Sequence, residues 1–340
     1  MWSKNGRQYQ RLDSAGFCDN QAGSARLPPK LSVDRKVISM EAPERKVSVW
    51  IVLGAFGLAF AVAWVGGAAW GVAATQAGRW LHFSATGIST LSLLGIGVIR
   101  LGVWIPVTRW VLKRRLGEIA FPSRPRGWLD LPVGAGLTAL ALAVLFFVTV
   151  RAGWLIIQGR AWQTLSTRDL LGNLWVSLLI NAVVALVEEI IFRAYLLTGL
   201  RQAWGKPLAL VVMAIIFGLI HAPALEGSQP LTEVAALLFM AAFGLLFGWV
   251  YLRTGSLWMP IGIHFAWDFL ENDVFNLSGD MANPHVVGFA TSLVGPSSTL
   301  GGLSNALLVD VLALALLCAG LWLWFAARSR VSPVTNVQEA

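Results

Sequence analysis

Eight long runs of apolar residues divide this chain, and they restrict its fold more than any other feature of the sequence. The runs cover approximately residues 47–74, 86–108, 129–150, 171–199, 207–224, 233–252, 257–272 and 303–326. About 20 consecutive apolar residues make a helix long enough to cross the hydrocarbon core of a bilayer. Only 13% of the 340 residues are charged, against roughly 25% in soluble domains. The sequence therefore predicts an all-α fold, a polytopic integral membrane helical bundle of about eight transmembrane helices.

The basic residues predict how these helices are oriented. Lys and Arg concentrate in the cytoplasmic loops of membrane proteins. With the N-terminus placed in the cytoplasm, 20 of the 26 Lys and Arg residues fall on the cytoplasmic side and four on the other side. We therefore expect both termini in the cytoplasm. The loop 273–302, which has no Lys or Arg, is expected outside.

Two local features qualify this map. The run 257–272 is short, so we expect it to be partly buried in protein rather than lipid. Pro106 and Pro223 predict helix ends, because proline interrupts a helical pattern.

Three ionisable residues interrupt the fourth run, in the stretch "ALVEEIIFRAYLL" from Ala185 to Leu197. Glu189 and Arg193 are four residues apart, on one helical face, and are expected to form an ion pair. Glu188 lies about 100° further round the helix, so it can meet a different partner. A carboxylate in a low-dielectric cavity, free of the arginine, suits general-base chemistry. A purely structural ion pair remains the alternative, although ionisable groups inside a membrane are usually functional.

Two further polar motifs follow on later runs. The fifth contains "IIFGLIHAP", with His221 four residues after Phe217, and the seventh contains "IGIHFAWDFLEN", with His264 and Asp268 four residues apart. Taken alone, each is explained by an interhelical or i,i+4 hydrogen bond. At a rise of 1.5 Å per residue, however, all three motifs reach comparable depths. We expect them to meet in one cavity in the cytoplasmic half of the membrane.

Arg100 and Asp310 also lie within apolar runs. Snorkelling to the interface or local pairing explains them, and the sequence assigns them no role.

The three motifs, in this order, resemble the CAAX protease and bacteriocin-processing family of membrane proteins, also called the type II CAAX prenyl endopeptidase or ABI family. Its pattern is E-E-x-x-x-R, then F-x-x-x-H, then H-x-x-x-N or a related residue. The resemblance covers about residues 170–272. It implies an intramembrane endopeptidase in which Glu188 activates water with His221. It further implies that His264 and residue 268 stabilise the intermediate, while Glu189 and Arg193 hold the helix geometry.

One residue departs from the pattern. Position 268 is Asp, where the prenyl-protein-processing members carry Asn. An ionised Asp accepts hydrogen bonds but cannot donate one to an oxyanion. Asp268 is therefore protonated, or orients His264, or ligates a metal.

A metal cofactor remains open at this stage. Glu188, His221 and His264 form a His₂Glu set, which some catalytic zinc sites use with a water in the fourth position. The sequence has no H-E-x-x-H motif. A divalent metal such as zinc and a metal-free scheme are both compatible with the residues, and we favour the metal-free scheme because Glu188 must be free to act as the base.

The same observations lead to expectations about partners, location and alternative functions. We expect partners to be membrane lipid and a membrane-associated protein or peptide substrate, with no nucleic acid, in the cell (plasma) membrane of a bacterium. The alternatives to a peptidase are a non-catalytic scaffold or bacteriocin-immunity protein and an ion-coupled transporter.

The apolar runs and the resemblance together give a domain plan. It comprises a disordered basic cytoplasmic tail at 1–46, N-terminal transmembrane helices at 47–160, the protease core at 170–272, an extracytoplasmic loop at 273–302, a final transmembrane helix at 303–327 and a cytoplasmic tail at 328–340.

Overall fold

A computed structural model describes residues 47–123, 125–222, 230–278, 286–294 and 305–331. All of them belong to one compact unit, Glu44–Ala340. The predicted tail 1–46, most of the predicted tail 328–340 and Pro223 lie outside the described residues.

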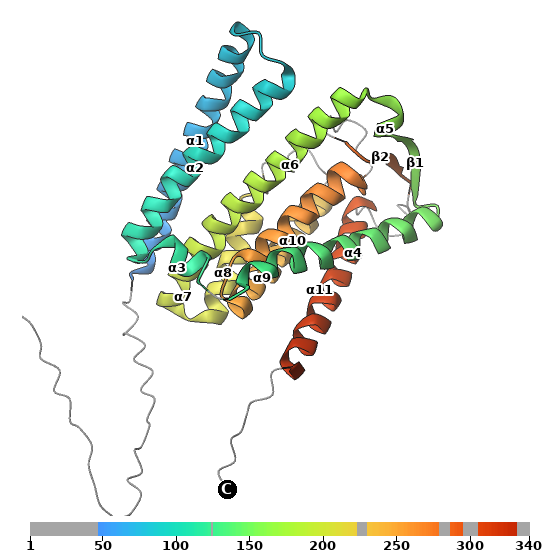
Figure 1. Ribbon diagram of the computed structural model, residues 1–340. Coiled ribbons are helices and arrows are strands. Elements are labelled where there is room, and N and C mark those ends of the chain that lie inside the picture. The colour runs from blue at the N-terminus through green and yellow to red at the C-terminus, as the bar shows by residue number, and fades with distance from the viewer. Residues whose placement is uncertain (1–46, 124, 223–229, 279–285, 295–304, 332–340) are drawn as a thin grey trace, which may run out of the picture. The chain divides into compact units, whose positions relative to one another are not determined.

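Each of the eight apolar runs coincides with a helix (Figure 1). Six of the described helices are long and apolar enough to cross a membrane, namely Val49–Trp80, Ala85–Leu112, Gly127–Arg151, Thr167–Trp204, Pro230–Thr254 and Asn305–Ser329. The runs at 207–224 and 257–272 give shorter helices. An all-α membrane protein is therefore confirmed, while the count of eight spans stays a prediction.

The elements follow one another in a simple order along the chain. They are α1 (Val49–Trp80), α2 (Ala85–Leu112), α3 (Leu116–Ala120), the 3₁₀ turn η1 (Gly127–Leu129), α4 (Asp130–Arg151), β1 (Leu155–Arg160), α5 (Ala161–Thr164), α6 (Thr167–Glu189), the π-helix η2 (Ile190–Leu197), α7 (Thr198–Trp204), α8 (Lys206–Leu219), α9 (Pro230–Thr254), α10 (Trp258–Asp268), the π-helix η4 (Phe269–Val274), β2 (Phe289–Leu293) and α11 (Asn305–Val331).

The prediction that Pro106 ends a helix is wrong. Helix α2 begins after Ser84, whose side chain accepts a hydrogen bond from the Gly87 backbone N–H, and it continues past Pro106 to Leu112. Proline removes one backbone donor. In a membrane helix, neighbouring helices can compensate for that loss, and α2 packs against α1 and α6.

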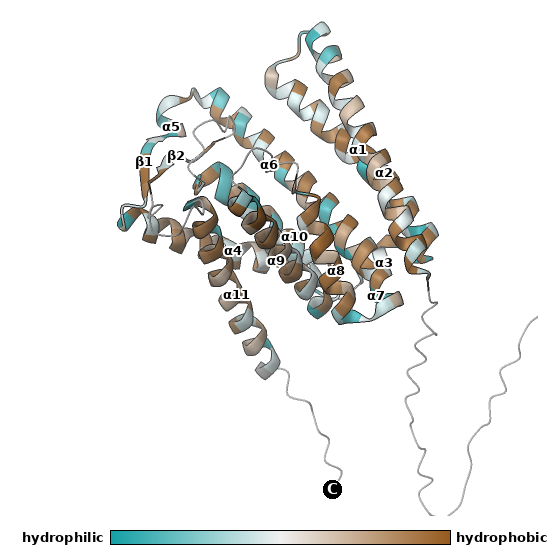
Figure 2. Ribbon diagram, turned by 180° about the vertical axis from the view of Figure 1, so that it is seen from behind, coloured by the Kyte–Doolittle hydropathy of each residue, from teal (hydrophilic) through white to brown (hydrophobic). Residues whose placement is uncertain are grey.

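A small antiparallel sheet was not predicted. Strands β1 and β2 pair from Leu155↔Leu293 to Arg160↔Phe289, and they lie at the end of the bundle away from α3 and α7 (Figures 1 and 2). Phe289 also packs on Phe146 of α4, with ring centroids 4.9 Å apart. The predicted loop 273–302 is therefore ordered in part, by pairing with a segment more than a hundred residues earlier in the chain.

Close helix contacts depend on glycine. A Cβ built on Gly262 of α10 would lie 2.1 Å from the Leu131 carbonyl oxygen. Small residues let membrane helices approach closely, so Gly262 fixes the distance between α10 and α4.

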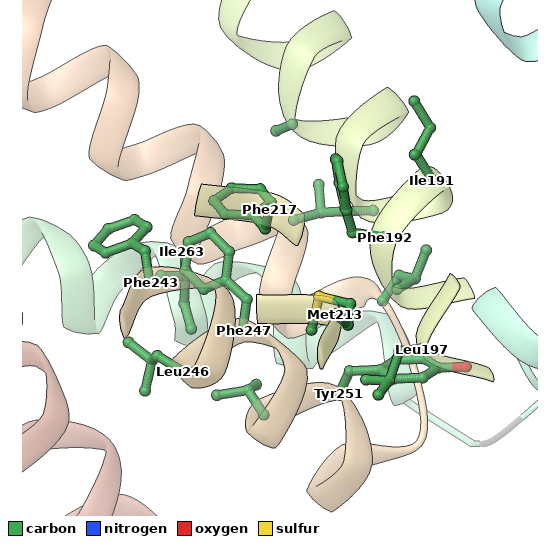
Figure 3. Close-up of a cluster of buried hydrophobic side chains, with 14 of the residues drawn as sticks. Ile191, Phe192, Leu197, Met213, Phe217, Phe243, Leu246, Phe247, Tyr251 and Ile263 are labelled. Atoms are coloured by element: carbon green, nitrogen blue, oxygen red, sulfur yellow. The ribbon is translucent and has the colours of Figure 1, made fainter. Parts of the chain in front are cut away.

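The outer surface of the bundle is apolar (Figure 2). Large exposed hydrophobic side chains include Leu58, Val65, Val98, Leu140 and Leu323. The interior holds an aromatic and aliphatic cluster (Figure 3) in which Phe192, Phe217 and Phe247 are almost fully buried. An exterior of this kind suits lipid contact, because a helix that is apolar all round is either buried or membrane-embedded.

Candidate active site

The Glu-Glu motif lies where the helix changes geometry. Helix α6 ends at Glu189 and continues directly as the π-helix Ile190–Leu197. Directly after it, the Thr198 side chain of α7 donates a hydrogen bond of 3.2 Å from Oγ1 to the Arg193 carbonyl oxygen, five residues earlier. A second π-helix begins directly after Asp268. Such segments occur frequently at functional sites, and here each follows a predicted site residue.

The expected ion pair between Glu189 and Arg193 is present. Arg193 Nη1 donates to Glu189 Oε1 at 3.0 Å, and both side chains are fully buried. The guanidinium also lies near the Phe217 and Phe247 rings, at 4.7 and 4.9 Å from their centroids. Arg193 Nε and Nη2 have no hydrogen-bond partner among the described residues, so the ring faces are their principal neighbours.

His264 lies between three carboxylates. Its Nδ1 donates to Glu189 Oε1 at 3.0 Å. Its Nε2 lies 3.4 Å from Asp268 Oδ2 and 3.9 Å from Glu188 Oε2. The spacing of His264 and Asp268 thus brings them together on one face of α10, as the sequence predicted. Both ring nitrogens of His264 therefore face carboxylate oxygens.

Glu188 and His221 line one cavity of about 370 Å³. The His221 imidazole donates from Nδ1 to the Phe217 carbonyl oxygen at 2.7 Å, which leaves Nε2 available. Apolar residues form most of the wall, and the lining comprises Phe60, Ala63, Trp64, Arg100, Trp104, Val187, Glu188, Ile191, Phe192, Ile220 and His221. His264 and Asp268 are not part of this lining. Of the four predicted catalytic residues, Glu188 and His221 therefore line the cavity, whereas His264 and Asp268 lie next to Glu188 outside that lining, with His264 buried and the Asp268 side chain 25% exposed.

The proposed metal set does not fit these positions. Within the part of the chain that the structure describes, no three His, Cys, Asp or Glu side chains are arranged to hold a metal ion. The Nδ1 atoms of His221 and His264 are both engaged in hydrogen bonds. Ligation through Nε2 would still be the usual arrangement of a metal-bound histidine, so the misfit lies in the placement of the side chains, with His264 Nε2 closer to Asp268 than to Glu188.

Sequence reasoning assigned no role to Arg100, yet Arg100 lines the cavity together with Glu188. Its Cζ lies 5.2 Å from the Trp64 ring centroid. The signal in the sequence was an arginine within an apolar run. Its position next to the site follows only from the packing of α2 against α6.

A buried polar network was also not predicted. Asp273 accepts hydrogen bonds from the Ser177 hydroxyl and, at 2.9 Å, from the Asn181 amide. These contacts join η4 to α6 and thereby help to fix the position of α10 relative to the Glu-Glu motif.

Comparisons with known proteins agree with the motifs. Residues 170–270 match a family profile described as type II CAAX prenyl endopeptidase Rce1-like. Over 103 residues the chain is 28% identical to the "Putative membrane peptidase YdiL" of Bacillus subtilis (strain 168), a match that covers 30% of this chain and 38% of that protein. No solved structure matches. Residues 170–270, which contain all three motifs, are therefore similar to the CAAX protease and bacteriocin-processing family of membrane proteins, and the match spans less than two fifths of the length of the Bacillus relative.

Proposed function

We propose that this protein is an intramembrane endopeptidase that hydrolyses a peptide bond of a membrane-associated protein or peptide. The observation that carries the proposal is the cavity shared by Glu188 and His221 within an otherwise apolar bundle. The match of residues 170–270 to the type II CAAX prenyl endopeptidase Rce1-like profile supports the reaction class. Binding pockets are characteristically apolar, with a few polar groups that fix the ligand, and this cavity has that composition.

Glu188 is the proposed general base. It is the only one of the two adjacent glutamates that lines the cavity, and Arg193 is paired with the other. Its carboxylate accepts a proton from water while the water oxygen bonds to the carbonyl carbon of the substrate. His221 assists from the same cavity through Nε2. The C–N bond then breaks, and the proton passes to the leaving nitrogen.

His264 and Asp268 are proposed to stabilise the intermediate from a position next to Glu188. With Nδ1 donating to Glu189, a protonated His264 would point its Nε2 proton toward Asp268 and Glu188. Asp268 then orients the imidazole, and the pair acts through charge rather than by direct contact with the substrate. Glu189 and Arg193 hold the helix geometry of the site.

We further propose eight membrane-embedded helices, both termini in the cytoplasm and a bacterial cell membrane as the location. The distribution of Lys and Arg supports this orientation. The arrangement in Figure 1 also agrees with it, because α3 and α7, which adjoin basic loops, lie at the end of the bundle opposite to β1 and β2.

The test is substrate trapping followed by cleavage with purified protein. The Glu188→Gln variant is expressed in cells, cross-linked to bound peptides, and its captured peptides are identified by mass spectrometry. A captured peptide is then incubated with wild-type protein in lipid nanodiscs. We expect cleavage by the wild type and none by Glu188→Gln, whereas Glu118→Gln, on an exposed glutamate of α3, cleaves normally. Full cleavage by purified Glu188→Gln would refute the mechanism.

A further inference from the structure

Arg100 gives the candidate cavity a permanent positive charge. Of the residues that line this cavity in the described part of the chain, it is the one Lys or Arg. It belongs to α2, whereas Glu188 belongs to α6. The two charged side chains thus reach the same space from different helices.

The guanidinium of Arg100 contacts an aromatic ring but forms no ion pair with Glu188 among the described residues. Trp64 lies 5.2 Å from its Cζ, which is within the range of a cation–π contact. Glu188, which carries the opposite charge when ionised, lines the same cavity. Among the described residues, however, the two form no ion pair of the kind that joins Arg193 to Glu189. Both side chains line the same cavity of about 370 Å³, and the guanidinium has five N–H donors in a fixed fork.

Hydrolysis of a peptide bond needs such a donor. When water attacks, the electron pair of the carbonyl moves onto its oxygen, and donors aimed at that oxygen lower the barrier. The nitrogens of His264 both face carboxylates, and His264 does not line the cavity. An ionised Asp268 has no proton to donate. Neither His264 nor an ionised Asp268 therefore offers a free donor to a substrate in the cavity.

We propose that Arg100 is a further catalytic residue, which donates hydrogen bonds to the carbonyl oxygen of the scissile peptide bond as negative charge develops on it. The inference rests on the proposed peptidase function. In the balanced step, the water proton goes to Glu188, the water oxygen bonds to the carbonyl carbon, and the carbonyl electron pair becomes the oxyanion held by Arg100. When the intermediate collapses, that pair restores the C=O bond, the C–N bond breaks, and the proton from Glu188 passes to the leaving nitrogen.

The kinetic test uses Arg100→Gln, Arg100→Lys and the control Arg79→Gln, which makes the same substitution on an exposed arginine at the end of α1. Loss of one oxyanion donor lowers kcat by about 10²–10³-fold, so we expect a loss of that order for Arg100→Gln with little change in KM. Arg100→Lys, which keeps the charge, recovers part of the rate. Unchanged kcat in Arg100→Gln, or a change confined to KM, would overturn the role of Arg100. Size-exclusion profiles and thermal unfolding check that each variant is folded.

A binding test separates this inference from the peptidase proposal. The probes are a short phosphinic peptide, whose anionic tetrahedral centre resembles the intermediate, and the parent peptide amide, both with leucine side chains. Wild-type protein is expected to prefer the phosphinic peptide at least tenfold, and Arg100→Gln is expected to lose that preference while Arg79→Gln keeps it. A preference equal in Arg100→Gln and wild type, or absent from the wild type, overturns the inference. An Arg100-dependent preference without any turnover by the wild type would instead refute the peptidase and leave Arg100 as an anion-binding residue.

Discussion

The pair formed by Glu189 and Arg193 permits a quantitative test of the site's interior. Replacing Arg193 by Met removes the charge and retains much of the side-chain length. Glu189 then keeps a single described donor, His264 Nδ1 at 3.0 Å, and its second oxygen already has no hydrogen-bond partner among the described residues. The substitution thus leaves a buried carboxylate half supported.

The magnitude follows from burial. Removing one member of a buried ion pair costs about 3–5 kcal/mol. The surviving bond from His264 places Arg193→Met near the lower limit, at about 3 kcal/mol, a change of more than 100-fold in the unfolding equilibrium. Two guanidinium nitrogens, Nε and Nη2, which have no hydrogen-bond partner among the described residues, are also lost. Removing them offsets little of the cost of Arg193→Met, because the ring faces of Phe217 and Phe247 already stabilise the guanidinium cation.

An exposed ion pair with the same distance between its nitrogen and oxygen atoms provides a matched control. Arg328 Nη1 lies 3.0 Å from Asp130 Oδ1, but the Arg328 side chain is 58% exposed. An exposed pair contributes at most about 1 kcal/mol, so Arg328→Met should have a small effect. The double variant Glu189→Gln/Arg193→Met removes both buried charges and should regain more than half of the loss.

The assay is reversible unfolding in mixed micelles with increasing SDS, followed by circular dichroism and tryptophan fluorescence. A cost of Arg193→Met no larger than that of Arg328→Met would show that Glu189 does not need the arginine in the folded protein. Failure of the double variant to recover stability would show that packing around Arg193, rather than charge, is what the substitution removes.

Three other predictions follow from single contacts or from the donor set. Gly262→Ala should destabilise the fold by several kcal/mol in the same SDS assay, because its Cβ would lie 2.1 Å from the Leu131 carbonyl oxygen. The control Gly136→Ala should be neutral or stabilising, because nothing lies within 4 Å of its Cβ. A neutral Gly262→Ala would contradict the close approach of α10 and α4. Tyr195→Phe removes the 2.9 Å hydrogen bond to the Val52 carbonyl oxygen and should cost about 1 kcal/mol in SDS unfolding; no loss would show that this bond adds no stability. Dialysis against 1,10-phenanthroline should change peptide cleavage by less than about twofold, since the described side chains form no three-ligand set; a loss of activity that zinc restores would refute the metal-free scheme.

Much of the fold could be read from local patterns. Apolar runs predict membrane helices because lipid offers no hydrogen-bond partners to the backbone, and all eight runs are helical. The ion pair of Glu189 and Arg193 was equally predictable, since four residues of helix bring the two side chains onto one face. Pro106 was misread because a local helix-ending rule gave way to the packing of α2 against its neighbours.

Other features depend on contacts between distant segments and have no local signal. The pairing of β1 with β2 joins residues more than a hundred positions apart. The π-helices that begin after Glu189 and Asp268 likewise have no counterpart in the spacing of the apolar residues.

The sequence by itself determined that this is a membrane helical bundle with three polar motifs, because hydrophobic length and helical spacing are local properties of a chain. Only the tertiary structure decided how those motifs divide. Glu188 and His221 line a cavity, whereas His264, which lies next to Glu188, and Asp268 are outside that lining. It also brought Arg100 to the cavity wall. The physical reason is that the identity of a buried charge's neighbours depends on how helices pack, and one sequence without its packing does not specify which faces meet.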